Sequence, residues 1–340
     1  DTFDYSRVLA ATYQPEQPPP VSQETAPRMN TGRFTHIAER MQFLYDRLQP
    51  FSHLGKPDGT IDSAGQDWIA RQIKQAVQRI DNTREYMLSQ ILSVGSFNLR
   101  QEGECMVVVP TSDTSGNYFN VDFGIPAAHK SQLNVFGAGN IISATWATAS
   151  NDIPKQLFAL HAASERKYGI PVTECWINTT TFNALRINNY MTMGSLSSGS
   201  FIIYKSMSKE PANNDYMQQG AFDVVFHAMP FITFHVINRS YIVGSRDETQ
   251  YTGTTYNLLT VPDNVAIFTP RPSRDWISAA EGSRTIRPRP NDGPQLQYGF
   301  HTYEVPMHGV GAAGVEKVVA DSFLIYLLSR YAIYIATVIF

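Results

Sequence analysis

The clearest pattern of apolar and polar positions is a helical stripe that begins near Ser63 and ends at Gly95. Ser63 and Gln66 have the spacing of a capping box, in which side chains satisfy backbone N–H groups of the first turn. Apolar residues then recur every three or four positions, at Ile69, Ile73, Ala76, Ile80, Met87 and Ile91. Glycine readily adopts the left-handed conformation that ends helices. The pattern therefore predicts one helix of about 30 residues, about 45 Å long.

Shorter segments with the patterns of strands and helices follow along the chain. Strand-like runs occur at residues 105–109, 118–123, 172–177, 222–227, 231–237 and 265–269. Helical spacing occurs at residues 153–168, which end at Gly169, and again at residues 179–189. Because helices and strands both recur, the predicted fold class is mixed α+β.

Three segments have the composition of arms or loops. Residues 1–33 contain several prolines among polar residues and too few apolar groups to pack alone, which predicts an extended arm. Residues 34–49 contain strand-like residues, and the next stretch has prolines, glycines and an Asp58-Gly59 turn. These features predict a protruding hairpin followed by a loop. The glycines and serines of residues 194–200 predict a flexible loop.

The apolar run of residues 322–340 admits two interpretations. It is about as long as the roughly 20 residues that a membrane-spanning helix requires. However, Arg330 stands near its middle, where a charge costs about 2.5 to 3.5 kcal/mol on insertion. Residues 331–340 are rich in β-branched and aromatic side chains, which favour strands. We therefore predict two buried strands and no membrane partner.

Composition and charge narrow the function classes. The hydrophobic content of 43% is enough for a substantial core. The formal net charge of -3 provides no large positive field for neutralising phosphates, which argues against a protein that reads DNA. The two cysteines, Cys105 and Cys175, are far apart in sequence, so neither a disulfide framework nor a structural zinc site is supported. Reduced thiols in a cytoplasm are the simplest interpretation.

A glycine motif near the end of the chain is too weak to indicate a nucleotide site. Gly309, Gly311 and Gly314 match the GxGxxG dinucleotide fingerprint. That fingerprint requires a preceding strand, a following helix and an acidic residue about 20 positions further on. Too little chain follows Gly314 for the remaining units, and Ser329 stands near the position of the acidic residue. A glycine-rich turn is therefore expected.

Other catalytic or metal motifs are equally weak. His301, Glu304 and His308 resemble a metal-binding set, but Pro306 prevents the helix that would align them, so a surface strand is expected. The serines of residues 194–200 lack the GxSxG sequence of a nucleophile elbow. The sequence thus predicts no enzyme, no cofactor and no metal.

A cluster of basic residues and one loop are candidate subunit contacts. The arginines of the cluster, which are interleaved with prolines and Trp276, are Arg271, Arg274, Arg284, Arg287 and Arg289. Arginine is enriched at interfaces, so contact with neighbouring subunits is the functional interpretation, with DNA contact as another. A solvated loop is the plain alternative, and it stays open. Lys56 and Asp58, in the predicted hairpin loop, are further candidate contacts, and a covalent cross-link through Lys56 is an additional hypothesis.

The order of these segments resembles the major capsid proteins of lambda-like tailed bacteriophages, which have the Hong Kong 97 phage fold (HK-97-like). Four stretches carry the resemblance, namely QPFSHLGKPDGTID, QIKQAVQRIDNTREYMLSQILSVGSFNL, VTECWINTTTFNALRINN and FITFHVINRSYIVGSRDETQYTGTTYNLLTVPDNVAIFTP. They are similar to that family's loop exit, long helix, strand with short helix, and returning strands. The resemblance extends over most of the chain from about residue 34, and the stretch before the long helix is shorter than in many relatives.

This resemblance implies a domain organisation and a function. The implied parts are an N-terminal arm at 1–33, an extended β-hairpin loop at 34–62, a peripheral domain with the long spine helix at 63–150, an axial domain at 151–270 and a return to the peripheral domain at 271–340. It implies a structural protein that self-assembles into pentamers and hexamers of an icosahedral head. The head would enclose double-stranded DNA without sequence-specific contact and form in the host bacterial cytoplasm. The implied partners are further copies, scaffold, portal and decoration proteins.

Three other classes of protein remain as alternatives. An encapsulin-like compartment shell shares the fold but encloses cargo proteins. A decoration or tail-tube subunit would not need a helix of about 30 residues. An α+β enzyme or sugar-binding domain would require a deep pocket with converging polar groups, and no site motif in the sequence supports one.

Overall fold

The computed structural model describes fifteen stretches of the chain, which divide between two compact units. The described residues are 35–44, 63–102, 105–114, 116–134, 139–142, 145–192, 202–207, 222–243, 256–271, 276–281, 283–286, 295–298, 301–306, 314–327 and 329–338. Of the described residues, unit 1 contains those within 86–277 and 327–338, and unit 2 contains those within 35–85 and 278–326. The domain boundaries expected from the sequence stay a prediction.

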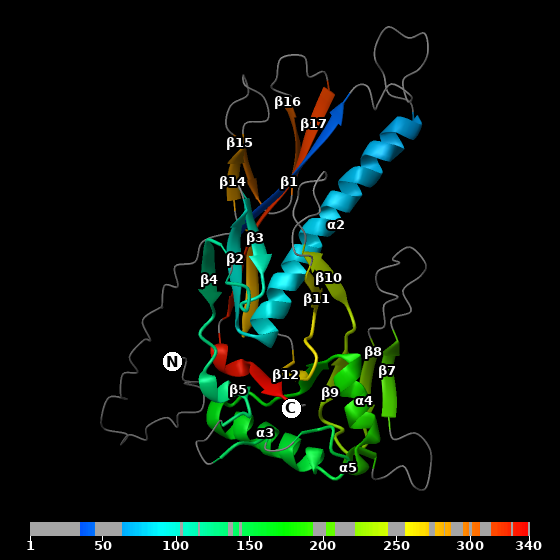
Figure 1. Ribbon diagram of the computed structural model, residues 1–340, viewed down its shortest axis with the longest axis vertical. Coiled ribbons are helices and arrows are strands. Elements are labelled where there is room, and N and C mark those ends of the chain that lie inside the picture. The colour runs from blue at the N-terminus through cyan, green and yellow to red at the C-terminus, as the bar shows by residue number, and fades with distance from the viewer. Residues whose placement is uncertain are drawn as a thin grey trace, which may run out of the picture. The chain divides into compact units, whose positions relative to one another are not determined.

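The longest element is helix α2 (Ser63–Ser93), drawn in cyan in Figure 1, and it confirms the predicted helix. It ends at Gly95, which has a φ of +84° and whose backbone N–H donates to the carbonyl of Gln90 over 3.0 Å. An added Cβ at Gly95 would lie 3.0 Å from Ile125 Cδ1. Both the left-handed backbone and the close packing therefore require glycine at the end of α2.

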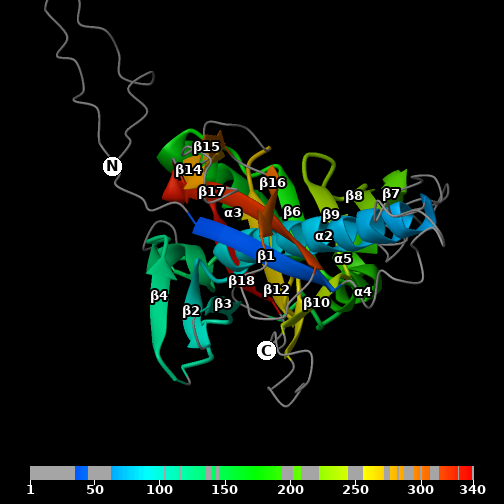
Figure 2. The ribbon, with the colours of Figure 1, turned by 90° about the horizontal axis from the view of Figure 1, so that it is seen from above.

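Unit 2 is built on a sheet that joins distant parts of the sequence. Its strands are β1 (Thr35–Leu44), β13 (Ile277–Glu281), β16 (His301–Pro306) and β17 (Gly314–Leu327), and a separate pair comprises β14 (Ser283–Ile286) and β15 (Gln295–Tyr298). β1 pairs antiparallel with β17 along its whole length, from Thr35 opposite Phe323 to Leu44 opposite Gly314 (Figure 2). Val319 of β17 packs against Ala76 and Ile80 of α2. Residues 45–62 lie outside the described residues, so the predicted hairpin loop stays a prediction.

Unit 1 contains a sheet of seven strands in the order β5-β18-β12-β6-β9-β8-β7. The strands are β5 (Lys130–Ser131), β6 (Glu174–Ile177), β7 (Ile202–Met207), β8 (Phe222–Phe226), β9 (Thr233–Val236), β12 (Val265–Thr269) and β18 (Tyr334–Thr337). The helices α3 (Ile153–Tyr168), α4 (Thr179–Ile187) and α5 (Asn189–Thr192) belong to the same unit. Leu157 and Leu185 from the helices pack with Phe226, Phe234 and Phe268 from the strands in one core. Alternate residues of these strands therefore point away from that core.

Two smaller sheets complete unit 1. One has three strands in the order β3-β2-β4, namely β2 (Ser96–Glu102), β3 (Cys105–Val109) and β4 (Tyr118–Asp122). Figure 2 shows β4 at the outer edge of this sheet, with β2 beside it. The other sheet pairs β10 (Ser240–Val243) with β11 (Tyr256–Leu259). Short 3-10 helices occur at Ala127–His129 (η3) and Arg330–Ala332 (η4).

The chain leaves unit 1 after Ile277 and returns at Leu327. The backbone N–H of Ser329 donates to the carbonyl of Trp276 over 3.2 Å. Trp276 is buried in a cluster with Ile333 and neighbouring apolar residues of unit 1. The segment of residues 278–326, called the excursion below, therefore begins and ends at neighbouring points of unit 1.

Most elements predicted from the sequence are confirmed, with small changes at their ends. The mixed α+β class holds, and α3 occupies the predicted residues 153–168 because Asp152 caps its start and Gly169, with a φ of +74°, ends it. The apolar segment near the C-terminus forms strands β17 and β18 around η4, as predicted. Among the described residues, no helix has the length and apolarity to cross a membrane. The predicted arm at 1–33 and the predicted loop at 194–200 lie outside the described residues.

Candidate functional site

The structure describes two of the predicted contact residues, Arg271 and Arg284. Arg271 follows β12, has an exposed side chain, and accepts a hydrogen bond through its carbonyl from Trp276 Nε1 at 3.2 Å. Arg284 stands in β14 opposite Gln297. Arg271 belongs to unit 1 and Arg284 to unit 2. The remaining candidates lie outside the described residues, namely Arg274, Arg287, Arg289, Lys56 and Asp58. The predicted contact cluster stays a prediction.

The structure also gives the context of the weak motifs. Gly314 is the first residue of β17, so a strand follows the glycines where the dinucleotide fingerprint requires a helix. His301 and Glu304 lie in strand β16, as the nearby Pro306 predicted. Within the part of the chain that the structure describes, no three His, Cys, Asp or Glu side chains are grouped so that they could hold a metal ion.

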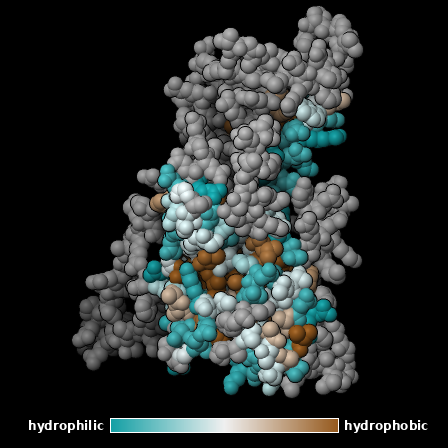
Figure 3. Space-filling model, viewed as in Figure 1, coloured by the Kyte–Doolittle hydropathy of each residue, from teal (hydrophilic) through white to brown (hydrophobic). Residues whose placement is uncertain are grey.

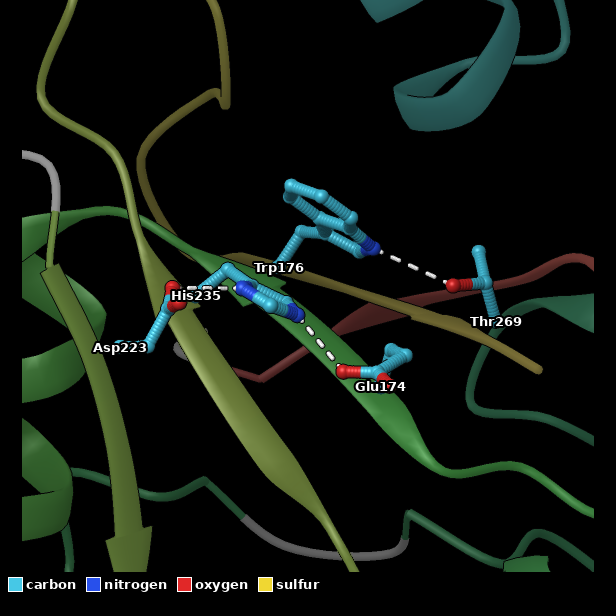
Figure 4. Close-up of polar contacts among 5 residues, drawn as sticks. All are labelled: Glu174, Trp176, Asp223, His235 and Thr269. Atoms are coloured by element: carbon cyan, nitrogen blue, oxygen red, sulfur yellow. Dashed lines mark hydrogen bonds and ion pairs between the residues drawn. The ribbon is translucent and has the colours of Figure 1, made fainter. Parts of the chain in front are cut away.

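A network of polar side chains (Figure 4) lies on the face of the seven-stranded sheet opposite the core that contains Leu157 and Leu185. It comprises Glu174 and Trp176 of β6, Asp223 of β8, His235 of β9 and Thr269 of β12. His235 Nδ1 lies 2.6 Å from Asp223 Oδ1, and His235 Nε2 lies 2.6 Å from Glu174 Oε2. Trp176 stacks on the His235 ring with centroids 4.2 Å apart and donates through Nε1 to Thr269 Oγ1 at 3.1 Å. The network thus ties four adjacent strands together.

The geometry of His235 fits a structural role better than a catalytic one. Both of its ring nitrogens are occupied by carboxylates, so neither is available to a metal ion or a substrate. The side chains of His235, Glu174 and Asp223 are 18%, 13% and 33% exposed, so water screens the network only in part. The network can hold the strands in register, because His235 and its two carboxylate partners come from three different strands.

A second histidine is fully buried at the junction of η3, α3 and β18. His129 stacks on Tyr334 with ring centroids 4.4 Å apart. Its Nδ1 lies 3.1 Å from the carbonyl oxygen of Ile333, and its Nε2 lies 3.0 Å from the hydroxyl of Tyr168. Desolvation by burial lowers the pKa of His129 to about 4, although the hydrogen bond to Ile333 acts in the opposite direction. A neutral ring can donate to Ile333 and accept from Tyr168.

Large apolar side chains are exposed at several points of unit 1. Tyr118 and Phe119, on β4, are 46% and 64% exposed, Phe158 on α3 is 51% exposed, and Ile187 at the end of α4 is 64% exposed. Figure 3 shows apolar patches between polar residues on the viewed face. Scattered exposed apolar residues are common, but two neighbouring exposed aromatic residues on one strand are a candidate contact site. The sequence predicted this strand but not its exposure.

Comparisons with known proteins relate these features to a family. The model of the family described as phage major capsid protein E matches residues 3–194, which is more than half of the chain. A search of curated protein sequences found no match.

Several solved structures are similar over most of the chain. A prophage capsid protein of E. coli CFT073 is 11% identical, with coverage of 89% of this chain and 76% of that chain and a TM-score of 0.49. A phage-related protein of Bordetella bronchiseptica is 12% identical, with coverage of 89% and 74% and a TM-score of 0.44. The holo-SrpI encapsulin complex of Synechococcus elongatus is 8% identical, with coverage of 90% and 74% and a TM-score of 0.40.

Proposed function

The chain belongs to the phage major capsid protein E family, and we propose that it assembles into the pentamers and hexamers of an icosahedral head that encloses double-stranded DNA. The observation that carries this proposal is the family match over residues 3–194, which includes α2, the β3-β2-β4 sheet, α3 and α4. A major capsid protein is present in many copies, so the function lies in contacts between copies.

The polar groups of unit 2 support a mechanical role. Arg84 on α2 forms a two-point ion pair with Asp321 on β17, with Nε 2.5 Å from Oδ2 and Nη2 2.9 Å from Oδ1. The Asp321 side chain is fully buried, and the Arg84 guanidinium lies 4.6 Å from the ring centroid of Phe323. This ion pair and the His235 network both use charged groups to join secondary-structure elements. We infer that the protein acts as a structural subunit without catalysis.

The near-neutral net charge of the chain is compatible with a head protein that does not neutralise the phosphates of the enclosed DNA. The formal net charge is -3, which supplies no large positive field for condensing DNA. We propose that DNA is enclosed without sequence-specific contact and that the scaffold, portal and decoration proteins of the head bind this chain. The proposed location is the virion capsid, after assembly in the host bacterial cytoplasm.

An encapsulin-like shell is the second candidate function. The family match to phage capsid proteins favours the phage head. The two functions differ in what the shell encloses, which is DNA in one case and cargo protein in the other. Nuclease-protected DNA in shells from infected cells would support the phage head, and enclosed protein without DNA would support the compartment.

The first test is assembly of the chain expressed alone. Size-exclusion chromatography at increasing concentration should shift protein from the monomer peak to much larger species. Negative-stain electron microscopy of that fraction should show shells, sheets, or rings of five and six subunits. A compact monomer that persists at high concentration, in the presence of a scaffold partner as well, would contradict the proposed function.

A further inference from the structure

Strand β4 presents an open edge of the β3-β2-β4 sheet. Within the described part of the chain, β4 pairs with β2 alone, from Ser96 opposite Asp122 to Arg100 opposite Tyr118. Four of its five residues are exposed, and Val121 is half-buried. An open strand edge offers a row of backbone N–H and C=O groups that can pair with another strand.

The two faces of this sheet differ in polarity, and the apolar face extends to the open edge. Residues directly opposite each other in an antiparallel pair point to the same face. Phe119 and Val121 therefore share a face with Leu99 and Phe97 of β2. Phe97 is 2% exposed, Leu99 is half-buried, and Phe119 at the edge is 64% exposed. The exposed fraction of the apolar side chains on this face thus increases from β2 towards β4.

The other face of the edge is polar and internally satisfied. Asn120 donates through Nδ2 to Asn98 Oδ1 at 2.8 Å. Arg100 forms an ion pair with Asp113 at 2.5 Å. The Asn120–Asn98 hydrogen bond and the backbone pairing join β4 to β2, so the edge is presented as a formed strand before any partner binds.

β4 contains no lysine, no proline and no β-bulge. Lysine, proline and β-bulges are the usual means of preventing edge-to-edge pairing. The strand reads YFNVD, and its register with β2 is regular. An open edge with two exposed aromatic residues is typical of a strand that binds another strand.

We propose that β4 pairs antiparallel with β4 of a second copy of this chain, which forms a two-fold contact between subunits. The proposal rests on the proposed function, because a major capsid protein meets many copies of itself. A two-fold contact uses the same surface on both copies, so the strand must be complementary to itself. β4 meets this condition when the pairing is centred on Asn120.

In that register, each pair of opposing residues is compatible. Phe119 faces Val121 of the second copy, which joins the apolar faces, and Tyr118 faces Asp122, whose carboxylate can accept from the phenol. The two Asp122 carboxylates are about 14 Å apart along the strands, beyond the screening length at physiological salt. A parallel pair would place them side by side, and a shift of one residue would mix the apolar and polar faces.

A cross-linking experiment tests the pairing directly. Opposing residues of an antiparallel pair have Cα atoms about 4.5 to 5.5 Å apart, which fits a disulfide. Assembled Asn120→Cys protein, treated with a mild oxidant, should give mainly dimers on non-reducing denaturing gels. The unmodified chain, with its own Cys105 and Cys175, is the control and should stay monomeric under the same oxidation. Shells of Asn120→Cys that yield only monomer would overturn the proposal.

A second variant tests the apolar contact. Phe119→Asp should lower the yield of shells at least tenfold while circular dichroism stays unchanged. Phe158→Asp, at another exposed aromatic residue of unit 1, should assemble as the unmodified chain does. Wild-type yields from Phe119→Asp would overturn the strand pairing and leave the capsid function intact. Absence of shells from the unmodified chain, with a scaffold partner present as well, would instead contradict the proposed function. Cross-linked dimers of soluble Asn120→Cys would then still support the pairing.

Discussion

Acidification should destabilise the protein through His129. The ring is buried between Tyr334, the Ile333 carbonyl and Tyr168, and its pKa is lowered from 6.5 to about 4. As the pH falls below 6.5, the unfolded chain binds a proton that the folded chain excludes until about pH 4. The stability associated with the neutral ring is therefore fully present above about pH 7.5 and is lost progressively between pH 6.5 and 4.

The size of this loss in unfolding free energy follows from the pKa values of His129 in the unfolded and folded chain. The difference between 6.5 and about 4 is about 2.5 pH units, and each unit corresponds to about 1.4 kcal/mol, so the maximal loss is about 3 kcal/mol. Between pH 7.5 and pH 5 the linkage relation gives a loss of about 2 kcal/mol. That loss is a large fraction of the stability of an ordinary domain.

Urea unfolding of the unassembled chain at pH 7.5 and pH 5 measures this effect. His129→Gln is the informative variant, because a glutamine can donate to Ile333 and accept from Tyr168 but does not titrate in this range. Between the two pH values, the unmodified chain should lose about 2 kcal/mol more unfolding free energy than His129→Gln does. His227→Gln, at an exposed histidine, should keep the unmodified pH dependence. Equal losses in the unmodified chain and His129→Gln would refute the reasoning.

Three further predictions concern substitutions of polar or charged residues. Arg84→Gln should lower the unfolding free energy by about 3 kcal/mol in urea titrations, because it leaves the Asp321 carboxylate buried without its ion pair; a loss below about 1 kcal/mol would argue against the pair. His235→Phe keeps a ring against Trp176 but removes both carboxylate contacts, so it should cost about 2 kcal/mol by the same measurement. Arg271→Glu should reduce the rate of shell assembly seen by light scattering, with unchanged circular dichroism, and a normal rate would leave Arg271 a solvated residue.

The sequence predicted those elements whose caps and apolar spacing lie within or next to the element itself. α3 was found at its observed residues because Asp152 can cap it, its apolar residues repeat with helical spacing, and Gly169 can adopt the left-handed conformation. β12 was also found at its observed residues, 265–269. The strands β2, β7, β10, β11 and β13 to β15 were not predicted, because their stability depends on partners elsewhere in the chain.

The contacts that hold the sites together could not be derived from local pattern. Glu174 and His235 are 61 residues apart, and they meet because β6 pairs with β9 in the sheet. Strand order and register are set by packing of the whole sheet, so neither partner of His235 was predicted. Conversely, Arg271 and Arg284 are close in sequence but belong to different units. The only sequence signal for His235 was its position: it is a polar residue between the apolar residues Phe234 and Val236.

Because the two ends of the excursion, residues 278–326, lie beside each other, parts of the chain between them can differ in length. Because Ser329 is hydrogen-bonded to the carbonyl of Trp276, the chain re-enters unit 1 beside the point where it left. Loop closure depends only weakly on loop length once the ends are held together. The connections between β14 and β15 and between β16 and β17 can therefore change in length while both anchor residues and the paired strands stay in place. An inserted peptide tag is best introduced in one of these connections.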